Sequence, residues 1–281
     1  MNLAVNRAVL RRTLIDLRWH IFWYGVGIAL YAAMMALLFP TFEGFLSETE
    51  YPEEFLQFFG EIGDMGDPRY FFQLEYYSFV PVILMIYGVI SGTGLLAGDE
   101  GRGTLETTLA QPIARGTLFR SRVAALLLGL LAICAINTLG WMVSVPFVDL
   151  GDLGLPTLIW ASFAVVPLVA AYCGLAVLVA AIAPSRGTAG GLMAAVAIFS
   201  YLVSSFANTI EAIAWMRWIT PYYYADTTQV LTDGLIWWHQ AALITVALVS
   251  FVLAWSAFNG REIGAGTWQP RAIARGWRVG R

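Results

Sequence analysis

The amino-acid sequence predicts an all-α integral membrane protein with six transmembrane helices. Its 281 residues are 59% hydrophobic and only 12% charged, whereas soluble domains carry about 25% charged residues. A hydrocarbon core about 30 Å thick is crossed by roughly 20 helical residues. Six apolar stretches are long enough, and none has an Asp, Glu or Arg in its interior. They cover residues 21–39, 79–97, 123–147, 158–183, 188–208 and 240–258.

The distribution of arginine predicts that both termini lie in the cytoplasm. All 16 basic residues are arginine, and 14 of them fall in the N-terminal segment, in the loops after the second and fourth stretches, or in the tail at residues 259–281. Only Arg69 and Arg217 fall in the other loops. Because cytoplasmic loops of membrane proteins are enriched in Lys and Arg, six spans with both ends inside satisfy every loop.

The segments outside the spans differ in composition. Residues 1–20 combine leucines with arginines, which favours an amphipathic helix on the inner membrane surface over a loosely ordered basic leader. The loop at residues 40–78 contains nine acidic residues and is expected to be a solvated, partly helical extracellular cap. Glu61, Asp64 and Asp67 lie close together there, but their spacing lacks the ligand pattern of an EF-hand, so no metal site is predicted.

Two residue types indicate how the spans meet their surroundings. Closely spaced glycines in the second span thin one side of that helix, which predicts close packing against another helix; they are Gly88, Gly92, Gly94 and Gly98. Several tryptophans fall near the predicted outer ends of spans, where aromatic belts form at the membrane interface; they are Trp141, Trp215, Trp218, Trp237 and Trp238.

The missing residue types exclude several functions. Without lysine the chain has neither a P-loop lysine nor a Schiff-base mechanism. Two cysteines and two histidines make a Cys/His metal site improbable, and no nucleophile has a base nearby, so we do not expect an enzyme. Ion-coupled transporters usually keep a charged group inside a span, which is missing here. Energy for uphill transport is therefore expected to come from another chain.

A few mildly polar side chains within the spans allow two interpretations. Asn137 falls in the third stretch, and Ser200, Ser204 and Ser205 fall in the fifth. Hydrogen bonding between helices is the interpretation we favour for such residues. Lining a substrate path is the alternative, and the sequence leaves both open.

The residues of the loop after the second span predict a short helix within it. Thr104 is suited to cap a helix, and Glu106 would lie in its first turn, where the helix dipole favours an anion. Leu105 and Leu109 are four residues apart and share one face, and Pro112 ends the helix or begins the next. A helix of about two turns, roughly 12 Å long, would suit a groove on a partner protein. An ordinary loop whose arginines obey the positive-inside rule is the alternative.

This loop, at residues 98–122, resembles the cytoplasmic loop of ABC-2 type transporter permeases. It follows the second span on the arginine-rich side, includes Arg102, and carries the run Glu100-x-x-Gly103-Thr104-Leu105-Glu106-x-x-Leu109-Ala110-x-Pro112-Ile113-x-Arg115. A weaker similarity is the Thr-Pro-aromatic run at residues 218–224, before the sixth span. Arg122 stands where this family often has lysine, a departure that keeps the charge.

The resemblance implies a fold and a set of partners. The whole chain would be a single ABC-2 type transmembrane domain, with residues 98–122 forming the coupling helix that docks onto an ABC ATPase subunit. ATP and Mg would bind to that ATPase, with no cofactor in this chain. A second permease subunit, identical or different, would complete the complex. The complex would lie among the lipids of a prokaryotic cytoplasmic membrane, as a multi-pass cell-membrane protein with no nucleic-acid partner.

The resemblance also implies a direction of transport. Most members of the family are exporters, so we expect export of a hydrophobic or amphipathic compound such as a drug, an antibiotic or a lipid. The alternative is a channel or scaffold that needs no nucleotide. Whether an ATPase co-purifies with the chain distinguishes the two.

Overall fold

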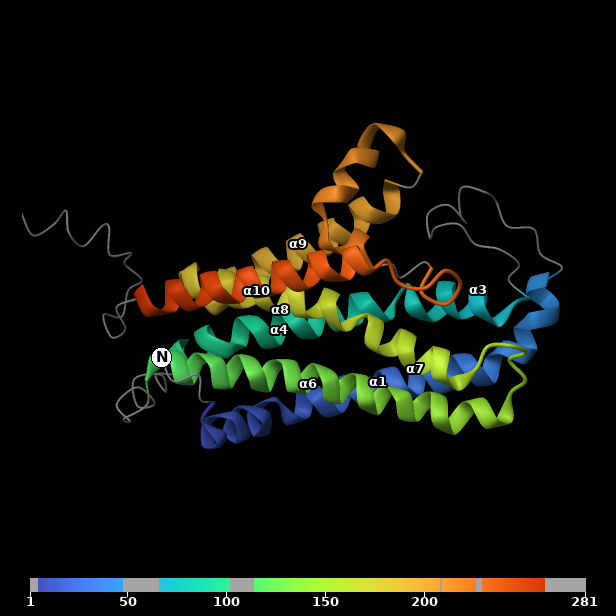
Figure 1. Ribbon diagram of the computed structural model, residues 1–281, viewed down its shortest axis with the longest axis horizontal. Coiled ribbons are helices and arrows are strands. Elements are labelled where there is room, and N and C mark those ends of the chain that lie inside the picture. Colours follow the sequence, from blue (N-terminus) through green and yellow to red (C-terminus); the bar gives the residue numbers. More distant parts are fainter. Residues whose placement is uncertain (1–4, 48–65, 102–113, 208, 226–228, 261–281) are drawn as a thin grey trace, which may run out of the picture.

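The computed structural model describes residues 5–47, 66–101, 114–207, 209–225 and 229–260. Within these ranges the regular elements are helices, and the long ones form an elongated bundle (Figure 1). Six segments of the described chain are long and apolar enough to cross a membrane, which confirms the number of spans predicted from hydropathy.

The six spanning segments and their connections have the following bounds. The first is α1 (Arg7–Ser47), and the second comprises α3 (Pro68–Phe72), the π-helical turn η1 (Gln73–Tyr77) and α4 (Val80–Gly101). The third is α6 (Arg115–Ser144), the fourth comprises α7 (Leu155–Ala164) and α8 (Val166–Ile182), the fifth is α9 (Arg186–Phe206) and the sixth is α10 (Trp237–Gly260). Three short 3₁₀ helices, η2 (Val145–Phe147), η3 (Glu211–Ile219) and η4 (Pro221–Ala225), lie in the connections.

Helix α1 joins the predicted surface segment to the first span. It contains 41 residues and is therefore about 60 Å long, roughly twice the thickness of a hydrocarbon core. Asn6 caps its start, since its Oδ1 accepts hydrogen bonds from the backbone N–H groups of Ala8 and Val9 at 2.9 and 3.2 Å. The sequence predicted a boundary at residue 20, where the structure has none. From Arg7 onward, the amphipathic segment is the first part of a helix that extends past the bilayer.

The second spanning segment begins well before the predicted residue 79. Asp67 caps α3 by accepting a hydrogen bond from the backbone N–H of Arg69 at 2.8 Å. Pro68 occupies the first helical turn, where a missing N–H costs nothing. The π-helical turn η1 then leads into α4 through a short connection.

The end of the predicted acidic loop is therefore part of the core. Phe71, Phe72 and Leu74 are buried, as are the tyrosines of η1. This part of the 40–78 loop is not the solvated cap that its acidity predicted, because its aromatic side chains pack among the spanning helices. Residues 48–65, with Glu61 and Asp64, lie outside the described residues.

The fourth span is divided into two helices. Val165 ends α7 and precedes α8, and Pro167 lies in the first turn of α8. A proline has no N–H to bond to the preceding turn, and its ring crowds the carbonyl there. The sequence predicted one unbroken stretch at residues 158–183, so the break is a feature that hydropathy alone did not show.

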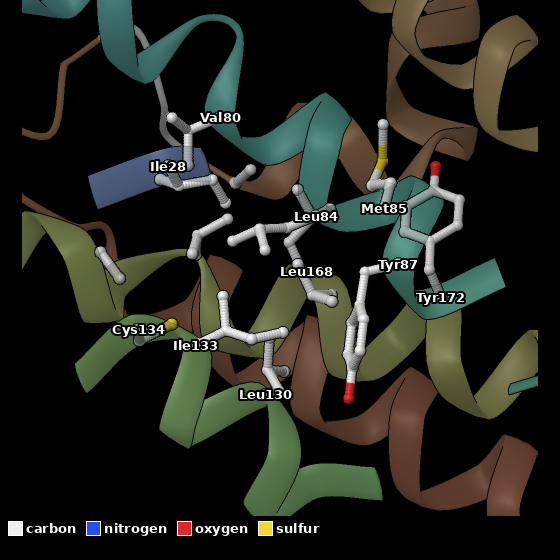
Figure 2. Close-up of a cluster of buried hydrophobic side chains, with 14 of the residues drawn as sticks. Ile28, Val80, Leu84, Met85, Tyr87, Leu130, Ile133, Cys134, Leu168 and Tyr172 are labelled. Carbon is white, nitrogen blue, oxygen red and sulfur yellow. The ribbon is translucent and has the colours of Figure 1, made fainter. Parts of the chain in front are cut away.

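The core lies where α1, α4, α6 and α8 meet. Figure 2 shows Ile28, Leu84, Leu130 and Leu168, one from each of these helices, among the buried side chains there. The predicted close approach of α4 is confirmed at Gly92, where an added Cβ would lie 2.8 Å from the Cβ of Ala176 on α8.

The helix ends that carry the arginines gather at one end of the bundle. The first residues of α1 and α6 and the last residues of α4 and α10 lie together at the left of Figure 1. Arg186, at the start of α9, lies against Gly94 near the same end of α4. We call this the arginine-rich end. Its placement in the cytoplasm remains a prediction from charge.

Candidate functional site

The predicted docking segment lies between two described helix ends. Helix α4 ends at Gly101 and helix α6 begins at Arg115. Glu100 thus belongs to the last turn of α4 rather than to an extended polar loop. The other predicted docking residues lie outside the described part of the chain: Arg102, Gly103, Thr104, Leu105, Glu106, Leu109 and Pro112. Their docking role stays a prediction, whereas the anchoring of the two flanking helices is shown.

Arg122 connects these two flanking helices. Its side chain is buried, and its Nη1 donates a hydrogen bond to the carbonyl oxygen of Leu95 at 2.8 Å. Hydrogen bonds that involve a charged group contribute about 1.5–3 kcal/mol. The sequence assigned Arg122 to the loop, but the structure places it about two turns inside α6. The helices on both sides of the docking segment are therefore bonded to each other.

The start of α1 contacts α6, and the start of α9 contacts α4, at this same end of the bundle. Ser121 on α6 accepts a hydrogen bond through Oγ from the backbone N–H of Asn6 at 2.9 Å. A Cβ added at Gly94 would lie 3.1 Å from Nη2 of Arg186, so the guanidinium group lies directly over α4. At this end, α6 thus contacts the start of α1, and α4 contacts the start of α9.

Asn137 forms a hydrogen bond between helices at the opposite end of the bundle. Tyr76 donates from Oη to Oδ1 of Asn137 at 2.6 Å, and both side chains are buried. Tyr76 belongs to the π-helical turn η1, an uncommon geometry that frequently occurs at functional sites. Its neighbour Tyr77 donates to the carbonyl oxygen of Leu158 at 3.0 Å. Together these bonds connect η1 to α6 and α7.

Ser200 is connected to the same region through η4. Its Oγ accepts a hydrogen bond from the backbone N–H of Tyr222 at 3.4 Å, and Tyr222 donates from Oη to the carbonyl oxygen of Ser78 at 3.2 Å. Ser204 and Ser205 are also buried on α9. Asn137 and Ser200 therefore do bond between segments, as the favoured interpretation expected. Their role in a substrate path remains a prediction.

Trp141 lies in the core, although its sequence position suggested the membrane interface. Its ring packs edge-on against Phe72 and Tyr76, with centroids 5.1 and 4.9 Å apart, and stacks on Tyr77 at 6.3 Å. The prediction was wrong because α3 and η1, assigned to a solvated loop, cover this end of α6.

The sequence analysis also missed a carboxyl group in the second spanning segment. Glu75 lies in η1 and is half-buried, and its backbone carbonyl accepts a hydrogen bond from Oη of Tyr31. The aromatic run YFFQLEYYSF around it was a signal that the apolar helix starts before residue 79.

An apolar groove lies beside this region on the surface of the bundle. It has a volume of about 390 Å³ and is lined by residues of α1 and α4, namely Trp23, Tyr24, Gly27, Ile28, Tyr31 and Ile83. Pockets for small molecules usually measure about 300–1,000 Å³, so the groove has the size of a small-ligand site. The predicted path residues do not line it.

The described residues contain no group of three or more His, Cys, Asp or Glu that could hold a metal ion. Both cysteines, Cys134 and Cys173, are free and buried. What the described structure does provide is a set of apolar spans, bonded helix ends at the arginine-rich end and a buried polar network at the other.

These features define a multi-pass α-helical membrane protein. The class can be narrowed by comparison, because the family model for the multidrug efflux system permease Rv1217c, C-terminal domain, matches residues 15–259. The chain belongs to this family of ABC-2 type permeases. Membership of this family makes it a permease. A search of curated proteins found no match.

Proposed function

We propose that the chain is the membrane-spanning subunit of an ATP-driven exporter of hydrophobic or amphipathic compounds, such as drugs, antibiotics or lipids. The observation that carries this proposal is the family match over residues 15–259, which includes most or all of each spanning segment and the whole loop at 98–122. The permease that gives the family its description is a multidrug efflux protein.

The energy in this proposal comes from a separate ABC ATPase. A chain without lysine has no P-loop, so ATP and Mg would bind to the ATPase subunit. That subunit would dock on residues 98–122, with Leu105 and Leu109 entering a groove on its surface. A second permease subunit, identical to this one or related to it, would pair with the first in the cytoplasmic membrane.

The bonded helix ends support a route for the motion. Because Arg122 joins α6 to α4, a push on the docking segment would move both helices together. Helix α4 packs closely on α8, and α6 packs along α1, so the displacement would reach most of the bundle. In this mechanism, closure of the ATPase subunits switches the spans between inward- and outward-facing arrangements.

The substrate path is proposed to pass polar groups of modest strength. Asn137, Ser200, Ser204 and Ser205 carry no charge, and an amphipathic compound needs only a few hydrogen-bonding groups among apolar ones. Breaking the bonds of Asn137 and Ser200 during the transport cycle would free them to contact such a compound.

Charge changes on the docking face test the proposal. Leu105→Asp and Glu106→Arg should each lower ATP-dependent transport tenfold or more, because removing a central contact of an interface costs about 2 kcal/mol or more. Transport and permease-stimulated ATP hydrolysis would be measured in proteoliposomes that contain the permease and its ATPase. Thr107→Asp is the matched control for Leu105→Asp. It introduces a carboxylate on the predicted helix face opposite Leu105 and should retain activity.

Two results would contradict the proposal. Full transport by Leu105→Asp and Glu106→Arg would remove the docking role. Failure of any ABC ATPase to co-purify, together with solute flux that needs no nucleotide, would instead indicate the channel or scaffold alternative.

A further inference from the structure

The connection between the fifth and sixth spans forms an arm that projects from the bundle. The arm consists of η3 and η4 and is drawn in orange in Figure 1. Helix α9 starts at the arginine-rich end and has 21 residues, and α10 returns there with 24. Each is thus about 30–36 Å long, close to the thickness of a hydrocarbon core. The arm therefore lies at the opposite boundary of the membrane.

The surface of the arm has the composition of a membrane interface. Trp215 and Ile219 are 62% and 72% exposed, and Trp237, at the start of α10, is 73% exposed. Tryptophans concentrate at the level of lipid headgroups, where one side of the ring meets acyl chains and the other meets water. These side chains would contact lipid at that level.

Arg217 lies on this surface against two neighbouring aromatic rings, whose centroids are 4.9 Å apart. Its guanidinium carbon lies 5.4 Å from the centre of the Trp218 ring and 5.3 Å from that of Tyr223. Tyr223 in turn packs against Tyr224 and His239, at centroid distances of 5.2 and 5.4 Å. The arginine therefore packs on an aromatic cluster that reaches His239 at the start of α10.

The charge of Arg217 is not neutralised by the described part of the chain. Among the described residues its side chain forms no hydrogen bond or ion pair, and Nε is buried without an acceptor. Arg217 is half-buried, and the N–H edge of a guanidinium matches the oxygens of a phosphate. A charged group without an anionic partner is costly when it is partly buried, so an anion beside the half-buried guanidinium would stabilise it.

We propose that Arg217, packed against Trp218 and Tyr223, binds the phosphate of a phospholipid in the outer leaflet. The phosphate would accept hydrogen bonds from the guanidinium edge, while the acyl chains lie along Ile219 and Trp215. A lipid bound here would fix the arm to the membrane at the boundary where α9 ends and α10 begins. This site is separate from the docking segment and does not depend on the proposed transport activity.

Two short-chain lipids and inorganic phosphate separate the possible sources of the phosphate. The purified full-length protein in detergent would be titrated with dioctanoyl phosphatidylglycerol, with dioctanoylglycerol, which has the same tails without phosphate, and with inorganic phosphate. Binding would be followed by native mass spectrometry and by the apparent Tm. We expect binding and a raised Tm with the phospholipid alone. An equal effect from dioctanoylglycerol would show that the acyl tails alone account for binding. An equal effect from inorganic phosphate would show an adventitious ion only. Either result would overturn the proposal.

Substitutions then assign the effect to Arg217 and the rings beside it. Arg217→Gln should weaken phosphatidylglycerol binding about tenfold or more, since hydrogen bonds to charged groups are among the strong ones. Trp218→Leu should weaken it less, because the charge remains. Arg69→Gln removes the other arginine predicted on this side and should bind as the unmodified protein does. Equal weakening by Arg69→Gln and Arg217→Gln would reduce the effect to net charge and overturn the site.

The acid next to the arm provides a last control. Asp226 follows η4 and lies outside the described residues. In lipid-free detergent, Asp226→Asn should leave the Tm and the lipid affinity unchanged. A loss of Tm equal to that of Arg217→Gln would show that these two residues form an internal ion pair, and the phospholipid site would be rejected.

Discussion

Single glycines determine how closely α1 and α6 pack. A Cβ added at Gly140 would lie 2.2 Å from the backbone carbonyl oxygen of Ala29, and one added at Gly25 would lie 2.8 Å from Cδ1 of Ile136. Close approach through small residues is a common way for helices to associate in membranes, where there is little hydrophobic driving force between them. The side chain of Ile136 can rotate away from a Cβ added at Gly25. The backbone carbonyl of Ala29 can move away from a Cβ added at Gly140 only if helix α1 moves.

Gly140→Ala should therefore destabilise the protein. Overpacking a tight interior typically costs about 1–3 kcal/mol, and we expect a lower apparent Tm in detergent. Gly27→Ala is the matched control, because nothing lies within 4 Å of an added Cβ there. It should leave the Tm unchanged or raise it, since alanine favours a helix by about 0.5–1 kcal/mol over glycine. Equal Tm values for the two variants would contradict the packing argument.

At the scale of elements, the π-helical turn η1 organises the end of the bundle opposite the arginines. It bonds to α6 through Asn137, to α7 through Leu158 and to α1 through Tyr31. These contacts join segments far apart in the chain, such as Tyr76 and Asn137, which are 61 residues apart. A π-helical turn is stable only when its surroundings favour it over the α-helix, and the buried hydrogen bonds supply that preference.

The Tyr76–Asn137 bond should show measurable coupling. Tyr76→Phe leaves a buried amide without its donor, at a cost of about 1–3 kcal/mol. Asn137→Leu removes the amide itself. The double variant should therefore be more stable than the sum of the single effects predicts, with an interaction energy of about 0.5–3 kcal/mol.

Chemical or thermal unfolding of the four proteins in detergent would give this interaction energy. Tyr70→Phe, in the adjacent α3, removes a hydroxyl for which the described residues show no hydrogen bond. It should be close to neutral. Additive effects of Tyr76→Phe and Asn137→Leu would show that the bond contributes nothing to stability.

At the scale of the whole molecule, the distribution of arginine along the sequence agrees with the positions of the helix ends in the structure. The ends of α1, α4, α6 and α10 that lead to arginine-rich segments lie together (Figure 1). Each span takes the chain to the other side of the membrane, so two of these segments with an odd number of spans between them would lie on opposite sides. The structure thus shows that the helix ends leading to the basic segments share one side of the molecule. The positive-inside rule predicts which side of the membrane that is.

Thiol labelling in intact cells tests the predicted orientation. Glu43→Cys and Arg12→Cys place single exposed thiols near opposite ends of α1, whereas the two native cysteines are buried, at 1% and 0% exposure. A membrane-impermeant maleimide should label Glu43→Cys in intact cells and Arg12→Cys only after the membrane is opened. The unmodified protein should remain unlabelled. The reverse pattern would show that the termini lie outside.

The sequence by itself determined the class of the protein, the number of spans and the segregation of its arginines. These properties follow from local composition, because the transfer of about 20 apolar residues into hydrocarbon is favourable whatever their neighbours are. The close packing at the glycines of α4 was also predictable from local sequence, because small residues allow any neighbouring helix to come close. The family resemblance rested on a run of residues that is likewise local.

Only the tertiary structure decided what the boundary residues do. Trp141, Glu75 and Arg122 lie near the ends of apolar stretches, where composition changes gradually and burial depends on distant partners. Arg122 is buried because the carbonyl of Leu95 accepts its hydrogen bond, and Trp141 because the α3–η1 segment covers it. A polar or aromatic side chain enters the core only where another segment satisfies its hydrogen bonds or packs against its ring, and that partner is set by the fold.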